Sequence, residues 1–275
     1  MSIPGRVCHS VLFYWPVEPK LEHSHDSLLQ QVESLALLPA QVAGRIDAIR
    51  ATVLKESKCI TSPDFKSIAL SDLETIYQLY DHYFFSGLVA KTLGSTPLEF
   101  ELSGRLTRSA GKTVYFRAPS KRFLIGVSTT LLFGCFTEED HRSIVCSGIV
   151  CRDRLDALLR VMEHELVHLI EFVLWGKSSC ARQRFHSISL RTFAHTKNVH
   201  SMITPVEKAR QQLGIVSGVK VSFKIDGRAL TGIVNRVTKR ATVLVEDDEG
   251  RLYSDNKRYL KYYVPLSMLE VVSSS

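Results

Sequence analysis

Apolar residues recur at helical spacing along several stretches of the chain, and each stretch is predicted to form a helix. The longest runs from Arg152 to Gly176, where glycine is a typical residue at a helix end. Another runs from Ser71, the expected N-cap, to Phe85. Two more precede it, at 27–38 and 39–55. We expect these two helices to form an accessory N-terminal region over residues 1–65.

Two shorter helices are predicted after Gly176. The polar loop Lys177–Cys180 leads to a helix whose apolar face begins at Phe185 and ends at Phe193. The sequence from Thr204 to Glu207 then combines a capping box with proline at the first helical position, and Gly214 ends that helix. The hydrophobic pattern changes beyond this point, so we place a domain boundary between residues 205 and 206.

Short apolar runs bounded by turn residues predict strands in two regions. The first region is expected to have strands at 98–102, 113–116, 123–127 and 144–149, with a charged turn at Glu138–Asp140 before the last of them. The second is expected to have strands at 219–225, 230–237, 242–246 and 262–272, with turns at Asp226-Gly227 and Glu249-Gly250. Short strands at such spacing are typical of a small five-stranded barrel. The fold class predicted is therefore α+β, with helices and strands mixed over residues 66–205 and a small β-barrel over residues 206–275.

Composition is that of a globular protein, with 45% hydrophobic residues and a net charge of +7. The excess of Lys and Arg lies after residue 65, which suits an acidic partner such as DNA. No apolar run is long enough to span a membrane, and residues 1–20 lack the features of a secretory signal, so we expect an intracellular protein, cytoplasmic or nuclear. The 6 cysteines form no C-x-x-C pair, which argues against a disulfide framework and against a second, structural zinc site.

The segment His164-Glu165-Leu166-Val167-His168 carries the most informative chemistry, because it lies within the longest predicted helix. Residues four apart on a helix share one face, so both imidazoles can bind one zinc ion, with the carboxylate of Glu165 set toward a water on that ion. The alternative is a pair of half-exposed histidines that bind no metal. The apolar surroundings favour the zinc site, with Glu165 as the general base.

Three stretches together resemble the SprT-like family of zinc metallopeptidases, which includes the Spartan proteases. Residues 79–84 read L-Y-D-H-Y-F and are followed by Gly87-Leu88, residues 102–111 read L-S-G-R-L-T-R-S-A-G, and the third stretch is the H-E-x-x-H segment. The resemblance covers about residues 70–200. It implies a zincin-like metallopeptidase domain: a helix, a small antiparallel sheet, the zinc helix, and a further helix whose start delivers the third zinc ligand.

The sequence leaves the third ligand open, because Ala181-Arg182-Gln183-Arg184-Phe185 stands where the family has His-Gly-x-x-Phe. Cys180 is our preferred candidate, since a thiolate at a helix start is favoured both by zinc and by the helix N-terminus. His186 is next, although its position within a helix also suits a half-buried histidine without a metal. His195, at the far end of that helix, is better suited to a capping role, and Glu171 to a supporting or surface role.

We therefore predict a zinc-dependent endopeptidase with Zn²⁺ bound by His164, His168 and Cys180 and with Glu165 as its base. Tyr115 and Arg105 are candidate donors to the oxyanion. The expected substrate is a protein, and if the C-terminal SH3-like or KOW-type barrel binds DNA, a protein associated with DNA. The alternatives are a hydrolase of another amide or ester, and a non-catalytic zinc-containing scaffold whose barrel binds nucleic acid or a protein. The oligomeric state and the role of residues 1–65 are not predicted.

Overall fold

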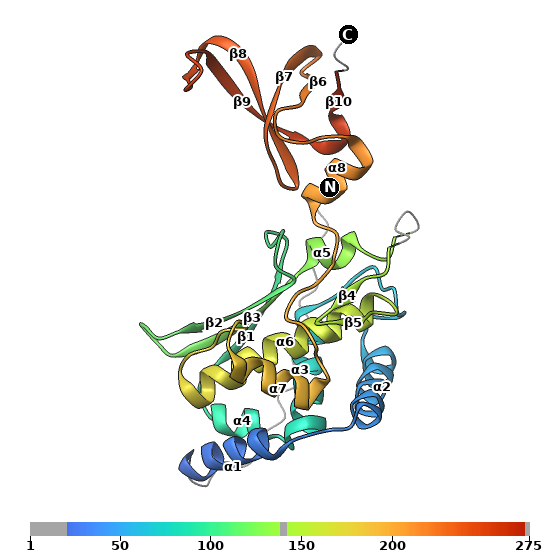
Figure 1. The fold of residues 1–275 in the computed structure, drawn as a ribbon, viewed down its shortest axis with the longest axis vertical. Coiled ribbons are helices and arrows are strands. Elements are labelled where there is room, and N and C mark those ends of the chain that lie inside the picture. Colours follow the sequence, from blue (N-terminus) through green and yellow to red (C-terminus); the bar gives the residue numbers. More distant parts are fainter. Residues whose placement is uncertain (1–20, 138–141, 273–275) are drawn as a thin grey trace, which may run out of the picture.

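The computed structural model describes residues 21–137 and 142–272, which fold into a larger and a smaller part (Figure 1). Each part has a hydrophobic core of its own. The larger core draws on buried residues from Leu28 to Met202, and the smaller core on residues from Ala209 to Leu269. Helices and strands are mixed in the larger part, and the smaller part is mainly an antiparallel sheet. The coarse α+β prediction is therefore confirmed. The predicted turn at 138–140 and the features expected for residues 1–20 lie outside the described residues.

The larger part contains most of the helices and the first five strands. In chain order its elements are α1 (Leu21–Ser34), α2 (Pro39–Glu56), α3 (Leu70–Phe85), α4 (Leu88–Leu93), β1 (Leu98–Ser103), β2 (Gly111–Phe116), β3 (Arg122–Ser128), α5 (Thr129–Gly134), β4 (Val145–Cys146), β5 (Ile149–Val150), α6 (Arg154–Trp175) and α7 (Gln183–Phe193).

Helix α6 is the long helix expected from the apolar spacing, and it runs through the middle of the larger core (Figure 1). Its N-cap is Asp153, whose side chain accepts a hydrogen bond from the backbone N–H of Asp156 at 3.0 Å. Its end is Gly176, which has a left-handed backbone with φ 66°. Both ends lie within two residues of the prediction. The helix that carries the H-E-x-x-H segment is therefore fixed by local signals.

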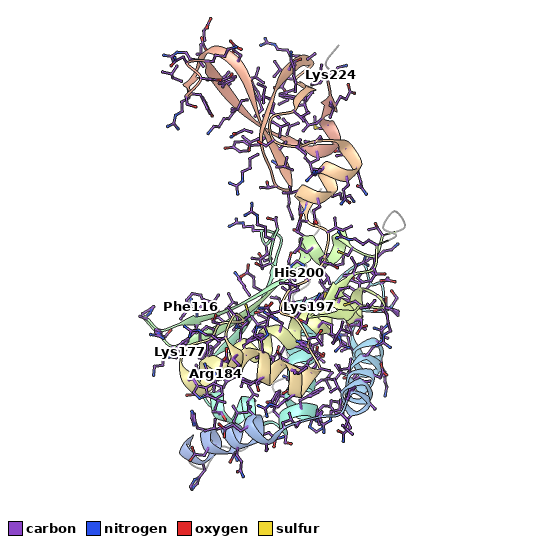
Figure 2. All side chains as sticks on the ribbon, in the orientation of Figure 1. Phe116, Lys177, Arg184, Lys197, His200 and Lys224 are labelled. Carbon is purple, nitrogen blue, oxygen red and sulfur yellow. The ribbon has the colours of Figure 1, made fainter. Side chains whose placement is uncertain are left out.

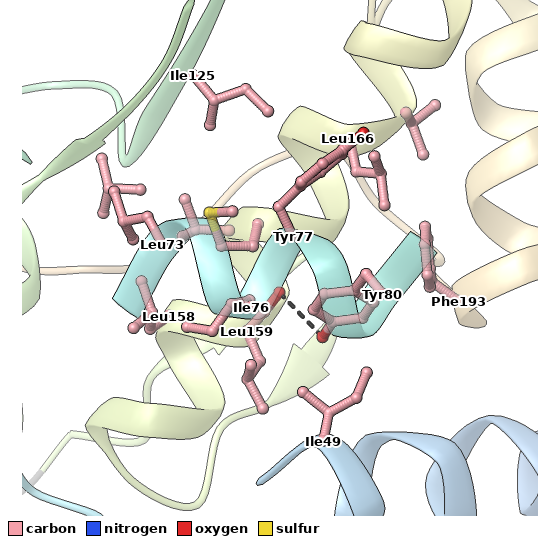
Figure 3. Packing of buried hydrophobic residues seen from close by; sticks show 14 of the residues in the cluster. Ile49, Leu73, Ile76, Tyr77, Tyr80, Ile125, Leu158, Leu159, Leu166 and Phe193 are labelled. Atoms are coloured by element: carbon pink, nitrogen blue, oxygen red, sulfur yellow. Dashed lines mark hydrogen bonds between the residues drawn. The ribbon is translucent and has the colours of Figure 1, made fainter. Parts of the chain in front are cut away.

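The two N-terminal helices contribute buried residues to the larger core. Figure 3 shows Ile49 of α2 in the same cluster as Tyr80 of α3 and Leu159 of α6, and Ile49 is fully buried. Arg50 of α2 also pairs with Asp153, the N-cap of α6, through a bond of 2.7 Å from Nη1 to Oδ1. The accessory role of residues 1–65 stays a prediction, and the packing of α2 adds a contact that the amphipathic pattern could not give, because such a pattern does not say which surface a helix covers.

The sheet of the larger part is mixed, whereas the expectation was a small antiparallel sheet. Its order is β1-β3-β2, with β1 parallel to β3 and β2 antiparallel to β3. Strand β2 therefore lies at one edge, and its contacts with α6 place it beside the H-E-x-x-H segment. The helix α3 also begins earlier than predicted: Ala69 is its N-cap, and Asp72 accepts the N–H of Ala69 at 2.7 Å. The two short strands β4 and β5 replace the single strand predicted at 144–149.

The smaller part begins with α8 (Pro205–Leu213) and continues with β6 (Lys220–Ile225), β7 (Arg228–Val237), β8 (Arg240–Leu252), β9 (Arg258–Pro265), a short 3-10 helix (Leu266–Met268) and β10 (Glu270–Val271). The predicted capping box of α8 is present, since Thr204 Oγ1 accepts the N–H of Glu207 at 3.2 Å.

The C-terminal sheet has the order β10-β6-β7-β8-β9, so β10 and β9 are its edges and no hydrogen-bonded closure is seen in the described part of the chain. The turn predicted at Glu249-Gly250 is wrong, because both residues lie within β8, at an irregularity in its pairing with β9. Among the described residues, no helix has the length and apolar character needed to cross a membrane. Cys59, Cys146, Cys151 and Cys180 are not part of disulfide bonds.

Candidate metal centre

The fold brings together the three residues predicted to bind zinc. Candidate ligand atoms of His164, His168 and Cys180 all lie within 4.8 Å of one another, and the three residues are half-buried. The two histidines lie one turn apart on α6, with ring centroids 5.0 Å apart. Cys180 reaches them from the loop between α6 and α7. Asn198, which follows α7, donates from its side chain to the carbonyl oxygen of Cys180 at 2.7 Å.

The other candidate ligands lie elsewhere. His186 is exposed on α7 and is not part of the group. His195 is only 3% exposed, and its Nε2 lies 2.6 Å from Oε2 of the buried Glu163, so its ring belongs to the core and does not cap the helix as predicted. Phe185 faces the two histidines, with its ring centroid 4.8 Å from that of His164 and 4.6 Å from that of His168, so its neighbour His186 lies on another face of α7.

Glu171 supports the site from one turn beyond His168. It is fully buried, and its Oε2 accepts the hydroxyl of Ser178 at 2.6 Å. The same hydroxyl oxygen lies 2.6 Å from Nδ1 of His168. Of the two roles expected for Glu171, only the supporting one is compatible with its burial, because a fully buried carboxylate is not at the surface. Sequence reasoning missed Ser178, whose only signal was its place in the polar loop before Cys180.

Glu165 is held against strand β2. The hydroxyl of Thr113 lies 2.8 Å from Oε2 of Glu165 and 3.0 Å from its backbone carbonyl oxygen. Gly111 leaves room for this carboxylate, because a Cβ atom at that position would lie 2.6 Å from Oε1 of Glu165. Burial raises the pKa of Glu165 to about 8, an effect that the Thr113 hydrogen bond reduces. A cation bound beside it would favour the ionised carboxylate.

Both imidazoles of the group are neutral at pH 7. Burial and the neighbouring His168 lower the pKa of His164 to about 3. Burial lowers the pKa of His168 to about 4, against the opposing charge of Glu171. Neutral imidazole is the form that binds a metal ion, so little proton release would be needed from these two ligands.

The group lies in a cleft with a volume of about 670 Å³. Helix α6 contributes His164, Glu165 and His168 to the lining, residues 109–113 at the start of β2 form part of it, and residues 198–202 between α7 and α8 form another part. The last segment is tied to β4, since Ser201 N–H donates to Val145 O at 2.8 Å. Figure 2 marks its position by the label of His200. Besides α6, the cleft is therefore lined by two segments that lie far apart in the chain.

The candidate oxyanion donors chosen from the sequence do not line this cleft. Tyr115 stacks on Phe123 at a centroid distance of 4.7 Å, and Arg105 is exposed in the loop before β2. His200 and Arg108 line the cleft instead, and Nε2 of His200 lies 3.1 Å from the carbonyl oxygen of Arg108. No sequence pattern pointed to His200, because it lies in a segment without regular periodicity.

The donor set fits zinc. Two imidazole nitrogens and a thiol are common zinc ligands, and three protein ligands with a free position are typical of catalytic sites. Among the described residues, no fourth His, Cys, Asp or Glu completes the group. A structural zinc site would usually have that fourth ligand. Comparisons of the chain with protein-family models, with curated proteins and with solved structures find no match.

Proposed function

We propose that this protein is a zinc-dependent endopeptidase of the SprT-like kind, in which His164, His168 and Cys180 hold the metal. The observation that carries the proposal is the position of Glu165. Glu165 lies on α6 between the two histidines in the sequence and lines the same cleft, and its buried carboxylate is held by a hydrogen bond from Thr113 of β2. Zinc, when bound, would activate a water molecule and polarise the scissile carbonyl.

Glu165 supplies the proton transfers of this reaction. Its carboxylate accepts a proton from the attacking water and then delivers it to the leaving amine. Burial suits both steps: a raised carboxyl pKa makes the ionised group a stronger base in the first step, and it favours the protonated form that acts in the second. The backbone of β2 and of residues 198–202 can hold an extended peptide across this position, since both segments line the cleft.

The test is the isosteric substitution Glu165→Gln. We expect one zinc per chain in both proteins, and loss of peptide hydrolysis by a factor of about 10² to 10⁴ in the variant, the usual contribution of a general base. Hydrolysis of an unfolded protein substrate and metal content are measured on the same preparations. Equal activity of the variant would exclude the proposed role of Glu165. Zinc without hydrolysis in the wild type would favour the non-catalytic scaffold.

A binding role of the C-terminal sheet is a second candidate function, and one face of the sheet supports it. Arg236, Thr242 and Tyr263 are directly opposite one another on β7, β8 and β9, and Tyr263 is 65% exposed. Leu244 pairs with Lys261 in the neighbouring row. An exposed aromatic ring between basic side chains is a common platform for single-stranded nucleic acid.

The order of the strands also supports a small barrel of the SH3-like kind. The last strand, β10, pairs beside the first, β6, and the 3-10 helix precedes it. This arrangement curls a five-stranded sheet around one core, although its two edges are not joined by hydrogen bonds in the described residues. Such a unit joined to a protease by α8 would bring substrates associated with DNA to the cleft. Thr204 and Glu207, at the start of α8, line that cleft.

A further inference from the structure

Glu171 is a carboxylate without solvent exposure, on a helix that is otherwise largely apolar. An ionised carboxylate in such a place is costly unless donors surround it. Three donors do so: Ser178 Oγ at 2.6 Å, Ser179 N–H at 3.2 Å and Arg184 Nε at 2.6 Å. All three come from the loop that carries Cys180 or from the start of α7. The carboxylate therefore links the zinc helix to the segment that carries the third candidate ligand.

The directions of these hydrogen bonds follow from the chemistry of the groups. A carboxylate paired with Arg184 only accepts, so the single hydroxyl hydrogen of Ser178 is donated to Glu171. The oxygen of Ser178 must then accept at its second contact, which is Nδ1 of His168 at 2.6 Å. His168 therefore carries its hydrogen on Nδ1. The lone pair of its Nε2 is left free.

We propose that Glu171 is a positioning residue, which sets the tautomer of His168 through Ser178 and fixes the loop of Cys180 through Ser179 and Arg184. This inference rests on the proposed zinc site and adds a reason for its geometry. Partners of this kind hold the ring of a metal-binding histidine in place and raise its basicity. In a direct pair the carboxylate would accept from the histidine itself. Here the hydroxyl of Ser178 lies between the two groups, and we call this chain of two hydrogen bonds the relay.

Arg184, which donates to Glu171, is itself held in place by two further contacts. Its guanidinium lies 4.1 Å from the ring centroid of Trp175, at the end of α6, and its Nη2 donates to the carbonyl of Lys177 at 3.2 Å. Figure 2 labels Arg184 and Lys177 near the C-terminal end of α6. The stacking limits the freedom of the guanidinium, so both ends of the 177–180 loop are held against one carboxylate.

The rival explanation is that Glu171 only holds α7 against α6, with no effect on His168. The substitution Ser178→Ala separates the two explanations, because it removes the relay but leaves the bonds from Ser179 N–H and Arg184 to Glu171. Ser178→Thr keeps a hydroxyl and serves as the conservative rescue. Ser179→Ala is the matched control, since it removes a hydroxyl from the next residue of the same loop and keeps the backbone N–H.

The experiment has two readouts on the full chain. The first is the tautomer of His168 in metal-free protein, observed by NMR on protein with nitrogen-15 in its histidines. We expect the Nδ1–H form in the wild type, in Ser178→Thr and in Ser179→Ala, and a shift toward the Nε2–H form in Ser178→Ala. The second is zinc affinity in competition with a chelator, which we expect to fall by about 10- to 100-fold in Ser178→Ala alone.

The outcomes are distinct. A wild type with the Nε2–H form, or an unchanged tautomer and zinc affinity in Ser178→Ala, would overturn the relay and leave the proposed enzyme standing. Equal losses of affinity in Ser178→Ala and Ser179→Ala would show a general effect of the loop, which also overturns it. A wild type that binds no zinc would remove the proposed function and, with it, the role of Glu171 at a metal site.

Discussion

Thr113 and Glu165 are joined twice, since the hydroxyl of Thr113 lies within hydrogen-bond distance of both the carboxylate and the backbone carbonyl of Glu165. The pair links the edge strand β2 to the middle of α6. The carboxylate cannot move toward the strand, because Gly111 already lies against it. Glu165 is therefore fixed in the cleft by two residues that the H-E-x-x-H segment does not contain.

The substitution Thr113→Val should lower the rate of hydrolysis without loss of zinc. Valine keeps the shape of threonine but cannot donate to Glu165, and the freed carboxylate would be displaced from its working position. We expect kcat to fall by about 10- to 100-fold, a typical effect of such misplacement. The measurement is kcat and zinc content for Thr113→Val beside Thr113→Ser, which keeps the hydroxyl. Equal rates in the two variants would show that the hydroxyl has no positioning role.

The substitution Cys180→Ala should weaken zinc binding and remove the spectroscopic signature of a thiolate ligand. Cobalt in the wild type is expected to show a sulfur-to-metal charge-transfer band in the near ultraviolet, and this band should be lost in Cys180→Ala. Cys59→Ala is the matched control, since Cys59 is also half-buried and lies outside the ligand group. A band that persists in Cys180→Ala would mean that another cysteine binds the metal.

Helix α6 and its two histidines are predicted well from the sequence, because a capped amphipathic helix is determined locally. Cys180 lies beside the two histidines, as its choice for the third ligand position requires, and its binding of a metal stays a prediction. The roles of Ser178, Thr113 and His200 could not be foreseen. Each depends on a contact between segments far apart in the chain, which periodicity does not encode. The packing of α2 against α3 is missed for the same reason.

The face of Arg236 and Tyr263 gives a separate prediction for nucleic acid. If it binds single-stranded DNA, Tyr263→Ala should weaken binding by about 1–3 kcal/mol through lost stacking. Arg236→Ala and Lys261→Ala should each reduce the dependence of log affinity on log salt by about 0.7. The measurement is fluorescence anisotropy of a labelled strand over a range of salt concentrations.

The control for this face is Lys224→Ala, because Lys224 is exposed on β6, away from β8 and β9 (Figure 2). Its affinity and salt dependence should match those of the wild type. Absence of binding at low salt would exclude a DNA role of the sheet. An equal effect of Lys224→Ala would indicate attraction by net charge without a defined face.

The burial of Glu165 predicts how the stability of the metal-free protein depends on pH. The carboxyl pKa is about 8 in the folded protein, against 4.5 for an unperturbed Glu. Between these values the folded state holds a proton that the unfolded state has lost. The free energy of unfolding therefore falls as pH rises through this window, by at most about 1.4 kcal/mol per pH unit. The loss is complete above the folded pKa.

The substitution Glu165→Gln removes this titration and keeps an oxygen that can accept from Thr113. The metal-free variant should therefore become more stable relative to wild type as pH rises from 4.5 to 8. His164 and His168 contribute the opposite slope, because their lowered folded pKa values leave the unfolded state with more protons below pH 6.5. These histidines are common to both proteins, so their contribution cancels in the difference to first order. Urea unfolding of both proteins at several pH values measures that difference, and a value independent of pH would show that Glu165 titrates normally in the fold.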